Sequence, residues 1–252
     1  MNVRFRERMR SGERLLGTIV TLAAPEVAEL MRIVGFDWLF LDGEHTPLEA
    51  VDLQHLIQAA GPDLPCLVRV PEAGETPVKK ALDIGAAGVV VPMVNSAEEA
   101  ERVVRLARYT PLGARGVGLG RAHGYGLRFQ EYMEQANRGV SVVIQAEHVQ
   151  AVERMEEIVR VEGVDAVFVG PYDLSASLGR PGEVDHPEVT AAIERITTVC
   201  RAAGMPLGVF GTDARAVRPY VARGYTLVVA GVDTMLLGEA ARRLLETLRS
   251  GV

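Results

Sequence analysis

The sequence predicts a single (β/α)8 barrel of the TIM type, an α/β fold, and three observations lead to this prediction. The chain has 252 residues, the usual length of one such barrel. Short apolar runs alternate with helical patterns from end to end, as expected for repeated βα units around a parallel sheet. The first predicted strand is not followed by a Gly-rich dinucleotide loop, which favours closure over an open doubly wound sheet.

Strands are expected where β-branched runs are nearly continuously apolar, because the strands of a parallel sheet are covered on both faces. Eight runs fit this description. They are residues 15–21, 38–42, 65–69, 88–91, 140–145, 166–169, 206–210 and 227–230.

Capping sequences indicate where the intervening helices begin. Thr46-Pro47-Leu48-Glu49 has the order of a capping box and predicts a helix running to about Ala60. Comparable signals stand at 96–99, 212–213 and 233–234, the last opening a C-terminal helix over residues 233–249. Glycines stand where helices should end: Gly61, Gly85, Gly163, Gly204 and Gly224.

One segment interrupts the regular spacing. Residues 109–137 follow the fourth strand and contain a Gly-rich stretch at 116–120, then His123, then an amphipathic run. The Gly-rich stretch lacks the Lys-Ser/Thr end of a P-loop, so it is interpreted as a flexible loop. No linker divides the chain, so residues 1–252 are expected to form one domain, with 109–137 as a long insertion.

Composition excludes several functional classes. With 27 basic and 33 acidic residues the net charge is -6, and no basic block offers contacts for nucleic-acid phosphates. No apolar run approaches the ~20 residues that cross a bilayer, and the Arg-rich start lacks the apolar core of a signal peptide. Cys66 and Cys200 could form one disulfide, but two buried thiols are the favoured interpretation, so a cytoplasmic protein is expected.

Active sites of such barrels lie where the strands end at their carboxyl side, so polar residues at those positions are the candidates. Two of them are carboxylates. Glu147 follows the fifth strand and Asp173 follows the sixth, so the two should lie close together and repel unless a cation or proton lies between them. Hard oxygen ligands favour Mg²⁺ or Mn²⁺. The alternative is that Asp173 only caps a helix and Glu147 is solvated.

His45 and Arg69 are candidates for proton transfer and anion binding. His45 stands three residues after Asp42, which could orient the ring and raise its basicity. Arg69 ends an apolar strand, where it would bind a carboxylate or enolate, or form a structural ion pair with Asp42, Glu44 or Glu72.

The lysines exclude one mechanism. A Schiff-base aldolase needs a lysine that faces the barrel interior. The chain has only Lys79 and Lys80, both in the helix predicted after the third strand. Carbanion stabilisation would therefore fall to a metal ion.

Four blocks of this sequence resemble the HpcH/HpaI family of class II, metal-dependent aldolases, over nearly the whole chain. The blocks are residues 36–45, which include Asp-Gly-Glu-His, 91–94, 115–118 and 170–175, Gly-Pro-Tyr-Asp-Leu-Ser. The resemblance implies reversible cleavage of a 4-hydroxy-2-oxo acid to pyruvate, or a related 2-oxo acid, and an aldehyde. The named substrates of such aldolases are 4-hydroxy-2-oxoheptanedioate, 2-dehydro-3-deoxyglucarate and 2-keto-3-deoxy-rhamnonate.

The resemblance also implies roles for individual residues. Glu147 and Asp173 would hold the divalent metal, Mg²⁺ or Mn²⁺ with Co²⁺ as a further candidate; His45 would be the catalytic base with Asp42 as its partner. Arg69 would polarise the 2-oxo group. The implied substrate contacts are Gln145, Gly170, Pro171, Tyr172 and Phe210. A homo-hexamer is implied, a trimer of dimers in which the last helix packs on a neighbouring barrel.

Two positions depart from the family pattern, and two other functions stay open. Ile19 stands where Trp is frequent in the family, and Tyr172 stands where a small residue is frequent, so the aldehyde is left undefined. The same metal-enolate core would also serve a citramalyl- or malyl-CoA-type lyase or an oxaloacetate decarboxylase. A more distant alternative is a non-catalytic barrel that binds a carboxylate.

Overall fold

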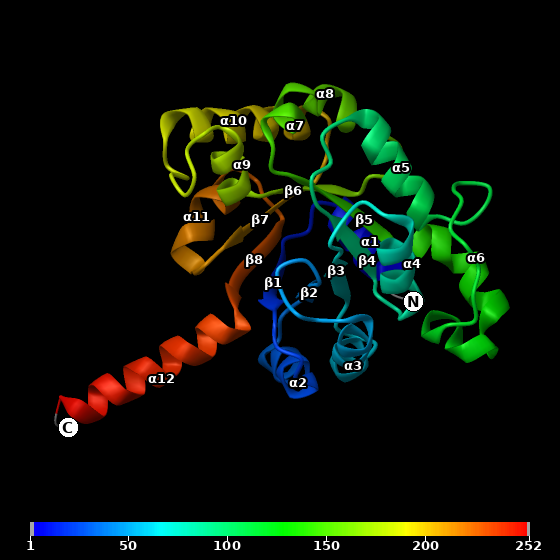
Figure 1. The fold of residues 1–252 in the computed structure, drawn as a ribbon, viewed down its shortest axis with the longest axis horizontal. Helices are drawn as coiled ribbons and strands as arrows, with labels where there is room; N and C mark the ends of the chain where they lie inside the picture. Colours follow the sequence, from blue (N-terminus) through cyan, green and yellow to red (C-terminus); the bar gives the residue numbers. More distant parts are fainter. Residues whose placement is uncertain (1–2, 251–252) are drawn as a thin grey trace.

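The structure, a computed structural model, describes residues 3–250 and is a closed barrel of eight parallel strands in the order β1 to β8 (Figure 1). Every predicted strand is present, with ends within two residues of the prediction. The strands are β1 Leu15–Val20, β2 Trp38–Asp42, β3 Cys66–Arg69, β4 Gly88–Val91, β5 Ser141–Ala146, β6 Ala166–Val169, β7 Leu207–Gly211 and β8 Leu227–Val232.

Helices cover the outside of the barrel, so the prediction of a TIM (β/α)8 barrel is confirmed (Figure 1). They are α1 Val3–Arg10, α2 Pro25–Val34, α3 Ala50–Ala60, α4 Glu75–Asp83, α5 Ala97–Ala107, η1 Arg121–Gly126, α6 Phe129–Gly139, α7 Val149–Glu153, α8 Met155–Ile158, α9 Pro171–Ser177, α10 Pro187–Ala202, α11 Ala214–Ala222 and α12 Asp233–Arg249. None of the helices within residues 3–250 is both long and apolar enough to span a bilayer.

Helix α3 begins later than the sequence predicted. Its cap is Glu49, which forms a capping box with Asp52, so the predicted start at Thr46 was wrong. Thr46 instead donates its hydroxyl hydrogen to the Asp42 carbonyl, a contact that closes the loop after β2. The Thr46 oxygen in turn accepts the Leu48 N–H at 3.3 Å, so both hydrogen bonds of this hydroxyl stay within the loop.

Apolar side chains fill the barrel on both sides of the sheet. Large side chains, among them Trp38 and Phe40 of β2 and Phe168 of β6, occupy the interior. Phe40 lies 5.5 Å from Phe168, centroid to centroid. The outward side chains of the strands pack against the helices in a second, larger core. A filled interior leaves the strand ends as the place where a ligand can bind.

Helix α1 closes the end of the barrel that lies opposite those carboxyl ends, a role the sequence did not suggest. Its Phe5 and Met9 are 1% exposed and pack into the interior core. Arg6 binds the fully buried carboxylate of Asp165, with Nη2 2.8 Å from Oδ1. Asp165 also forms an ion pair with Arg108. Burial lowers the pKa of Arg108 to about 10.

The insertion after β4 is ordered by η1 and α6. His123 within it is fully buried; its Nε2 lies 3.1 Å from the Tyr109 hydroxyl, and its ring stacks on Phe129. Arg115 lies over the Tyr109 ring at 4.6 Å and donates to Asp83 at 2.6 Å. His123 therefore supports this segment and does not reach the mouth of its own barrel.

Helix α12 leaves the barrel and extends away from it (Figure 1). Leu237, Leu244 and Leu248 are 67%, 62% and 66% exposed. Their spacing of seven and four residues places them in one apolar stripe. The end of the helix thus presents an apolar face to its surroundings.

Candidate active site

The carboxylate of Glu147 lies at the mouth of the barrel, directly after β5, and is 3% exposed. Its Oε1 accepts the main-chain N–H of Met93 at 2.8 Å, and its Oε2 accepts from the Gln145 amide. Burial, and then repulsion from Asp173, raise the pKa of Glu147 to about 7. Among the described residues this buried acid forms no ion pair.

Met93 supplies that N–H from an unusual backbone conformation. Its φ of 54° lies in the left-handed region, which costs free energy for a residue with a side chain. Such strain persists at functional sites when the surroundings require it. The sequence did not single out Met93, because a main-chain donor leaves no signature in residue type.

Asp173 lies in the first turn of α9, exposed to solvent, and its charge acts on both Glu147 and Glu44. The two carboxylates that the sequence predicted as neighbours therefore face the same space. Two hard oxygen ligands, one of them buried and without an ion-pair partner in residues 3–250, fit a divalent cation such as Mg²⁺ or Mn²⁺. Residues 3–250 contain no cluster of three or more acidic, His or Cys groups that could hold a metal ion.

Gly170 allows α9 to approach Glu147 closely. A Cβ at this position would lie 2.9 Å from both the Cβ and the Oε2 of Glu147, which is too close for a real contact. Gln145, 3% exposed, lies beside the same carboxylate, and its Oε1 is buried without a partner among the described residues. An unpaired buried amide oxygen next to the mouth is a possible contact for a ligand donor.

Arg69 ends β3 and is held by two acids. Its Nε and Nη2 donate to the two oxygens of Asp42 at 2.9 and 2.8 Å, and its Nε lies 3.3 Å from Glu44 Oε2. Arg69 is 9% and Asp42 4% exposed. Hydrogen bonds and the charge of Arg69 keep the pKa of Asp42 below its usual value, although burial opposes this. The site therefore contains a fixed cation that lies close enough to Glu147 for the charge of that carboxylate to help raise the pKa of Arg69.

Asp42 binds Arg69 and does not orient the His45 ring, which corrects the sequence-based pairing. Its Oδ1 accepts the main-chain N–H groups of Glu44 and His45 at 3.1 and 3.3 Å, so it shapes the backbone of the turn. The His45 ring lies beside Glu44, with Nε2 3.6 Å from Oε2, and its side chain is 62% exposed. Glu44, which the sequence suggested only as an ion-pair partner of Arg69, is therefore in contact with both candidate residues.

Only glycine fits at position 43 of the Asp-Gly-Glu-His turn. The Gly43 N–H donates to the Arg69 carbonyl at 2.9 Å, and a Cβ on Gly43 would lie 2.7 Å from that oxygen. The turn after β2 can therefore lie directly against the end of β3. This close approach brings Asp42, Glu44 and Arg69 together.

Three further predicted contacts lie around the same end of the barrel. Pro171 is buried at the start of α9, Tyr172 next to it is 51% exposed, and Phe210 is partly buried near the end of β7. Ile19, 7% exposed, lies on β1. These positions surround the mouth, but they contribute no charged group to it.

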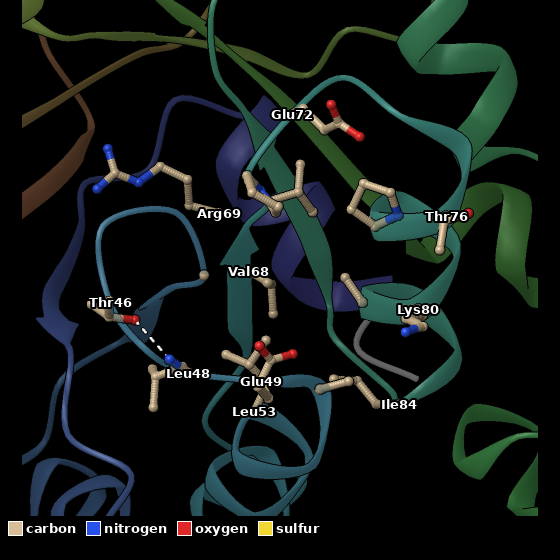
Figure 2. A pocket seen from close by; sticks show the side chains of 16 residues that line it. Thr46, Leu48, Glu49, Leu53, Val68, Arg69, Glu72, Thr76, Lys80 and Ile84 are labelled. Carbon is tan, nitrogen blue, oxygen red and sulfur yellow. Dashed lines mark hydrogen bonds between the residues drawn. The ribbon is translucent and has the colours of Figure 1, made fainter.

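A cavity of about 420 Å³ lies between α3 and α4, on the outer side of β3 (Figure 2). Glu49, Lys80 and Thr76 lie around it, whereas the Arg69 side chain points away from it (Figure 2). The charged groups of the candidate site therefore lie outside this cavity, although Gly43 and Arg69 belong to its lining.

The fold and these residues can be compared with known proteins. The family model described as HpcH/HpaI aldolase/citrate lyase matches residues 16–240. A hydroxypyruvate/pyruvate aldolase of Pseudomonas aeruginosa is 43% identical over 98% of this chain and 93% of its own length. A 2-keto-3-deoxy-L-rhamnonate aldolase of Escherichia coli O9:H4 (strain HS) is 41% identical over the same shares.

A solved structure gives the same result. The HpcH/HpaI aldolase/citrate lyase family protein from Burkholderia cenocepacia J2315 superimposes with a TM-score of 0.94 at 35% identity, covering 98% of this chain and 100% of that one. Because the family model covers most of the chain and the fold agrees, this chain belongs to the HpcH/HpaI aldolase/citrate lyase family, a family of lyases.

Proposed function

We propose that this enzyme is a metal-dependent aldolase that reversibly cleaves a 4-hydroxy-2-oxo acid into pyruvate, or a related 2-oxo acid, and an aldehyde. One observation carries the proposal: the buried carboxylate of Glu147 lies within reach of the charge of Asp173, and the fixed cation of Arg69 lies near the same carboxylate. The names of the two aldolase relatives favour the same class of substrate.

Glu147 and Asp173 would hold the divalent cation, Mg²⁺ or Mn²⁺, with Co²⁺ as a further candidate. When bound, the cation supplies the Lewis acidity that stabilises an enolate. Met93 and Gln145 fix the Glu147 carboxylate from two sides, which supports a preorganised ligand.

Arg69 would bind and polarise the 2-oxo oxygen. Asp42 engages its Nε and Nη2, while Nη1 forms no hydrogen bond among residues 3–250. Free N–H groups on an oriented guanidinium can donate to an oxygen whose negative charge grows during cleavage. Gln145, Gly170, Pro171, Tyr172 and Phe210 would line the pocket around the substrate.

His45 would take the proton from the C4 hydroxyl, directly or through a water. The C3–C4 bond then breaks, the aldehyde leaves, and the electron pair passes to the oxo oxygen of the developing enolate. The exposed position of the ring allows it to pass the proton to solvent.

The proposal includes an assembly and a compartment. The extended α12, with its exposed leucine stripe, supports a homo-hexamer built as a trimer of dimers in which this helix packs on a neighbouring barrel. Cys66 and Cys200 are both buried free thiols, which is compatible with the reducing cytoplasm.

Proton exchange tests this function. Enzyme incubated with pyruvate in heavy water should exchange the methyl protons, and EDTA should abolish the exchange. Exchange that persists after complete metal removal would contradict the metal's role. His45→Ala should retain metal binding, measured by calorimetry, and slow both exchange and cleavage by orders of magnitude.

The same preparation separates the alternatives. Release of CO2 from oxaloacetate without aldol products would favour a decarboxylase. Cleavage of a CoA thioester would favour the acyl-CoA lyases. An absence of any divalent-metal binding in the calorimeter would favour a non-catalytic carboxylate-binding barrel.

A further inference from the structure

The junction between β8 and β1 has an irregular backbone at the mouth of the barrel. The pairing of these two strands shifts register between Gly17 and Ile19, and Gly231 has a φ of 77°. The buried hydroxyl of Thr18 donates to the Gly231 carbonyl at 3.0 Å. This bulge changes the direction of the chain just before α12.

Asp233 follows the bulge and is a buried acid that the proposed chemistry does not use. It is 4% exposed. Its Oδ2 accepts the main-chain N–H groups of Thr21 and Leu22 at 2.9 and 3.0 Å, and its Oδ1 accepts the Thr21 hydroxyl at 2.6 Å. It forms no ion pair within residues 3–250, so its hydrogen bonds go to the loop after β1 and to the start of its own helix, at Thr234.

The loop that Asp233 holds borders one particular part of the mouth. The proposed groups for the 2-oxo acid stand at the ends of β2, β3, β5 and β6. The end of β4 carries Met93, which fixes the Glu147 carboxylate, so the ends of β7, β8 and β1 remain for the rest of the substrate in this closed ring of eight strands. Thr21 and Leu22 directly follow β1, so they lie on the side that the aldehyde would occupy.

We propose that Asp233 is a positioning residue for specificity: by fixing Thr21 and Leu22, it sets the shape of the aldehyde half of the pocket. This inference rests on the proposed aldolase function. A buried carboxylate that accepts two main-chain N–H groups and a hydroxyl holds a loop more tightly than solvent contacts would. The residue acts through the loop and needs no contact with the substrate.

Two reactions of the enzyme report separately on the two halves of the pocket. Exchange of pyruvate methyl protons requires only the 2-oxo acid half, whereas aldol addition of pyruvate to glycolaldehyde requires both. For Asp233→Ala we expect exchange within about twofold of wild type and a KM for glycolaldehyde raised at least tenfold. Thr21→Val, which removes only the hydroxyl contact, should give a smaller rise in the same KM.

A matched control removes a carboxylate that binds the main chain elsewhere. Asp52 accepts the Glu49 N–H at 2.9 Å in the capping box of α3, so Asp52→Ala should leave the glycolaldehyde KM unchanged. Hydrogen exchange measured by mass spectrometry gives a readout without substrate: the amides of Thr21 and Leu22 should exchange faster in Asp233→Ala than in wild type. If Asp233→Ala does not fold, the same measurements are made on Asp233→Asn and Thr21→Val.

The outcomes distinguish the two proposals. A wild-type enzyme that neither exchanges pyruvate protons nor forms an adduct would refute the aldolase function. If the wild type does both, equal losses of exchange and addition in Asp233→Ala would overturn the specificity role. An unchanged glycolaldehyde KM in all the folded variants would overturn it as well.

Discussion

Asp42 holds Arg69 by its edge, with two hydrogen bonds of 2.9 and 2.8 Å to Nε and Nη2. This arrangement fixes the plane of the guanidinium and leaves Nη1 free to act at the mouth. Asp42 therefore does not act as a histidine partner, because its other hydrogen bonds come from main-chain N–H groups. The first residue of the Asp-Gly-Glu-His turn therefore positions the cation, and the third lies beside the histidine.

Asp42→Asn should disturb the orientation of Arg69. An amide offers one oxygen to the guanidinium in place of two charged ones, so the two-bond pairing is lost. We expect kcat/KM for cleavage to fall about 100-fold, with pyruvate proton exchange reduced to a similar degree. Steady-state kinetics and proton exchange provide the measurements. Glu72→Gln, an acid that follows the same strand and forms no ion pair in the described chain, is the control and should behave as wild type.

Gly170→Ala should weaken metal binding without unfolding the protein. The added methyl group would meet Glu147 at 2.9 Å and displace its carboxylate, and mispositioned ligands typically lose about 10–100-fold in affinity. Calorimetric titration with Mn²⁺ measures the loss. The matched control is Gly238→Ala, since a Cβ at Gly238 meets no atom within 4 Å. Equal Mn²⁺ affinity in the two variants would contradict the placement of Glu147 as a ligand.

Glu147→Gln should stabilise the metal-free protein above neutral pH. Burial raises the pKa of Glu147 from 4.5 to about 7, so the folded state retains a proton that the unfolded chain has already lost. The stability that this proton contributes is complete below pH 4.5 and is lost as the pH rises through 7. The neutral amide avoids that loss, a difference on the order of 3 kcal/mol at pH 8.

Urea unfolding in EDTA at pH 5 and pH 8 measures this difference. The advantage of Glu147→Gln should be larger at pH 8, and saturating Mn²⁺ should reverse it, because the cation stabilises only the carboxylate form. The corresponding amide variant of an exposed acid, Asp173→Asn, should gain much less stability in the absence of metal. A stability gap that is independent of pH would show that Glu147 is not buried as a charged group.

The fold was predictable because each strand is an apolar run with its own boundaries. The bounds of β2, for example, coincide with the apolar run from Trp38 to Asp42, in which every residue is buried. The positions of Glu147, Asp173 and Arg69 followed from the rule that barrel active sites lie at strand ends. Helix α1 was missed, because its pairing of Arg6 with Asp165 spans 159 residues and leaves no local pattern.

Side-chain partners within the site were harder to predict than the residues themselves. Asp42 stands three residues before His45 and looks like its partner along the chain. In space it lies beside β3, and Arg69 is the stronger competitor for its charge. The role of Met93 depends on a main-chain N–H and a left-handed φ, neither of which is encoded by residue type.

Charges on the leucine stripe of α12 should break the proposed assembly. Leu237, Leu244 and Leu248 are exposed on one face of the helix, whereas Arg249 lies outside this stripe, about 100° around the helix from Leu248. Placing a carboxylate in an apolar interface imposes a desolvation cost that the interface cannot recover. We therefore expect Leu244→Glu/Leu248→Glu to shift the mass measured by light scattering from a hexamer to smaller species, while Arg249→Glu remains a hexamer. A wild-type protein that is monomeric at all concentrations would contradict the assembly, and a double variant that stays hexameric would place the interface elsewhere.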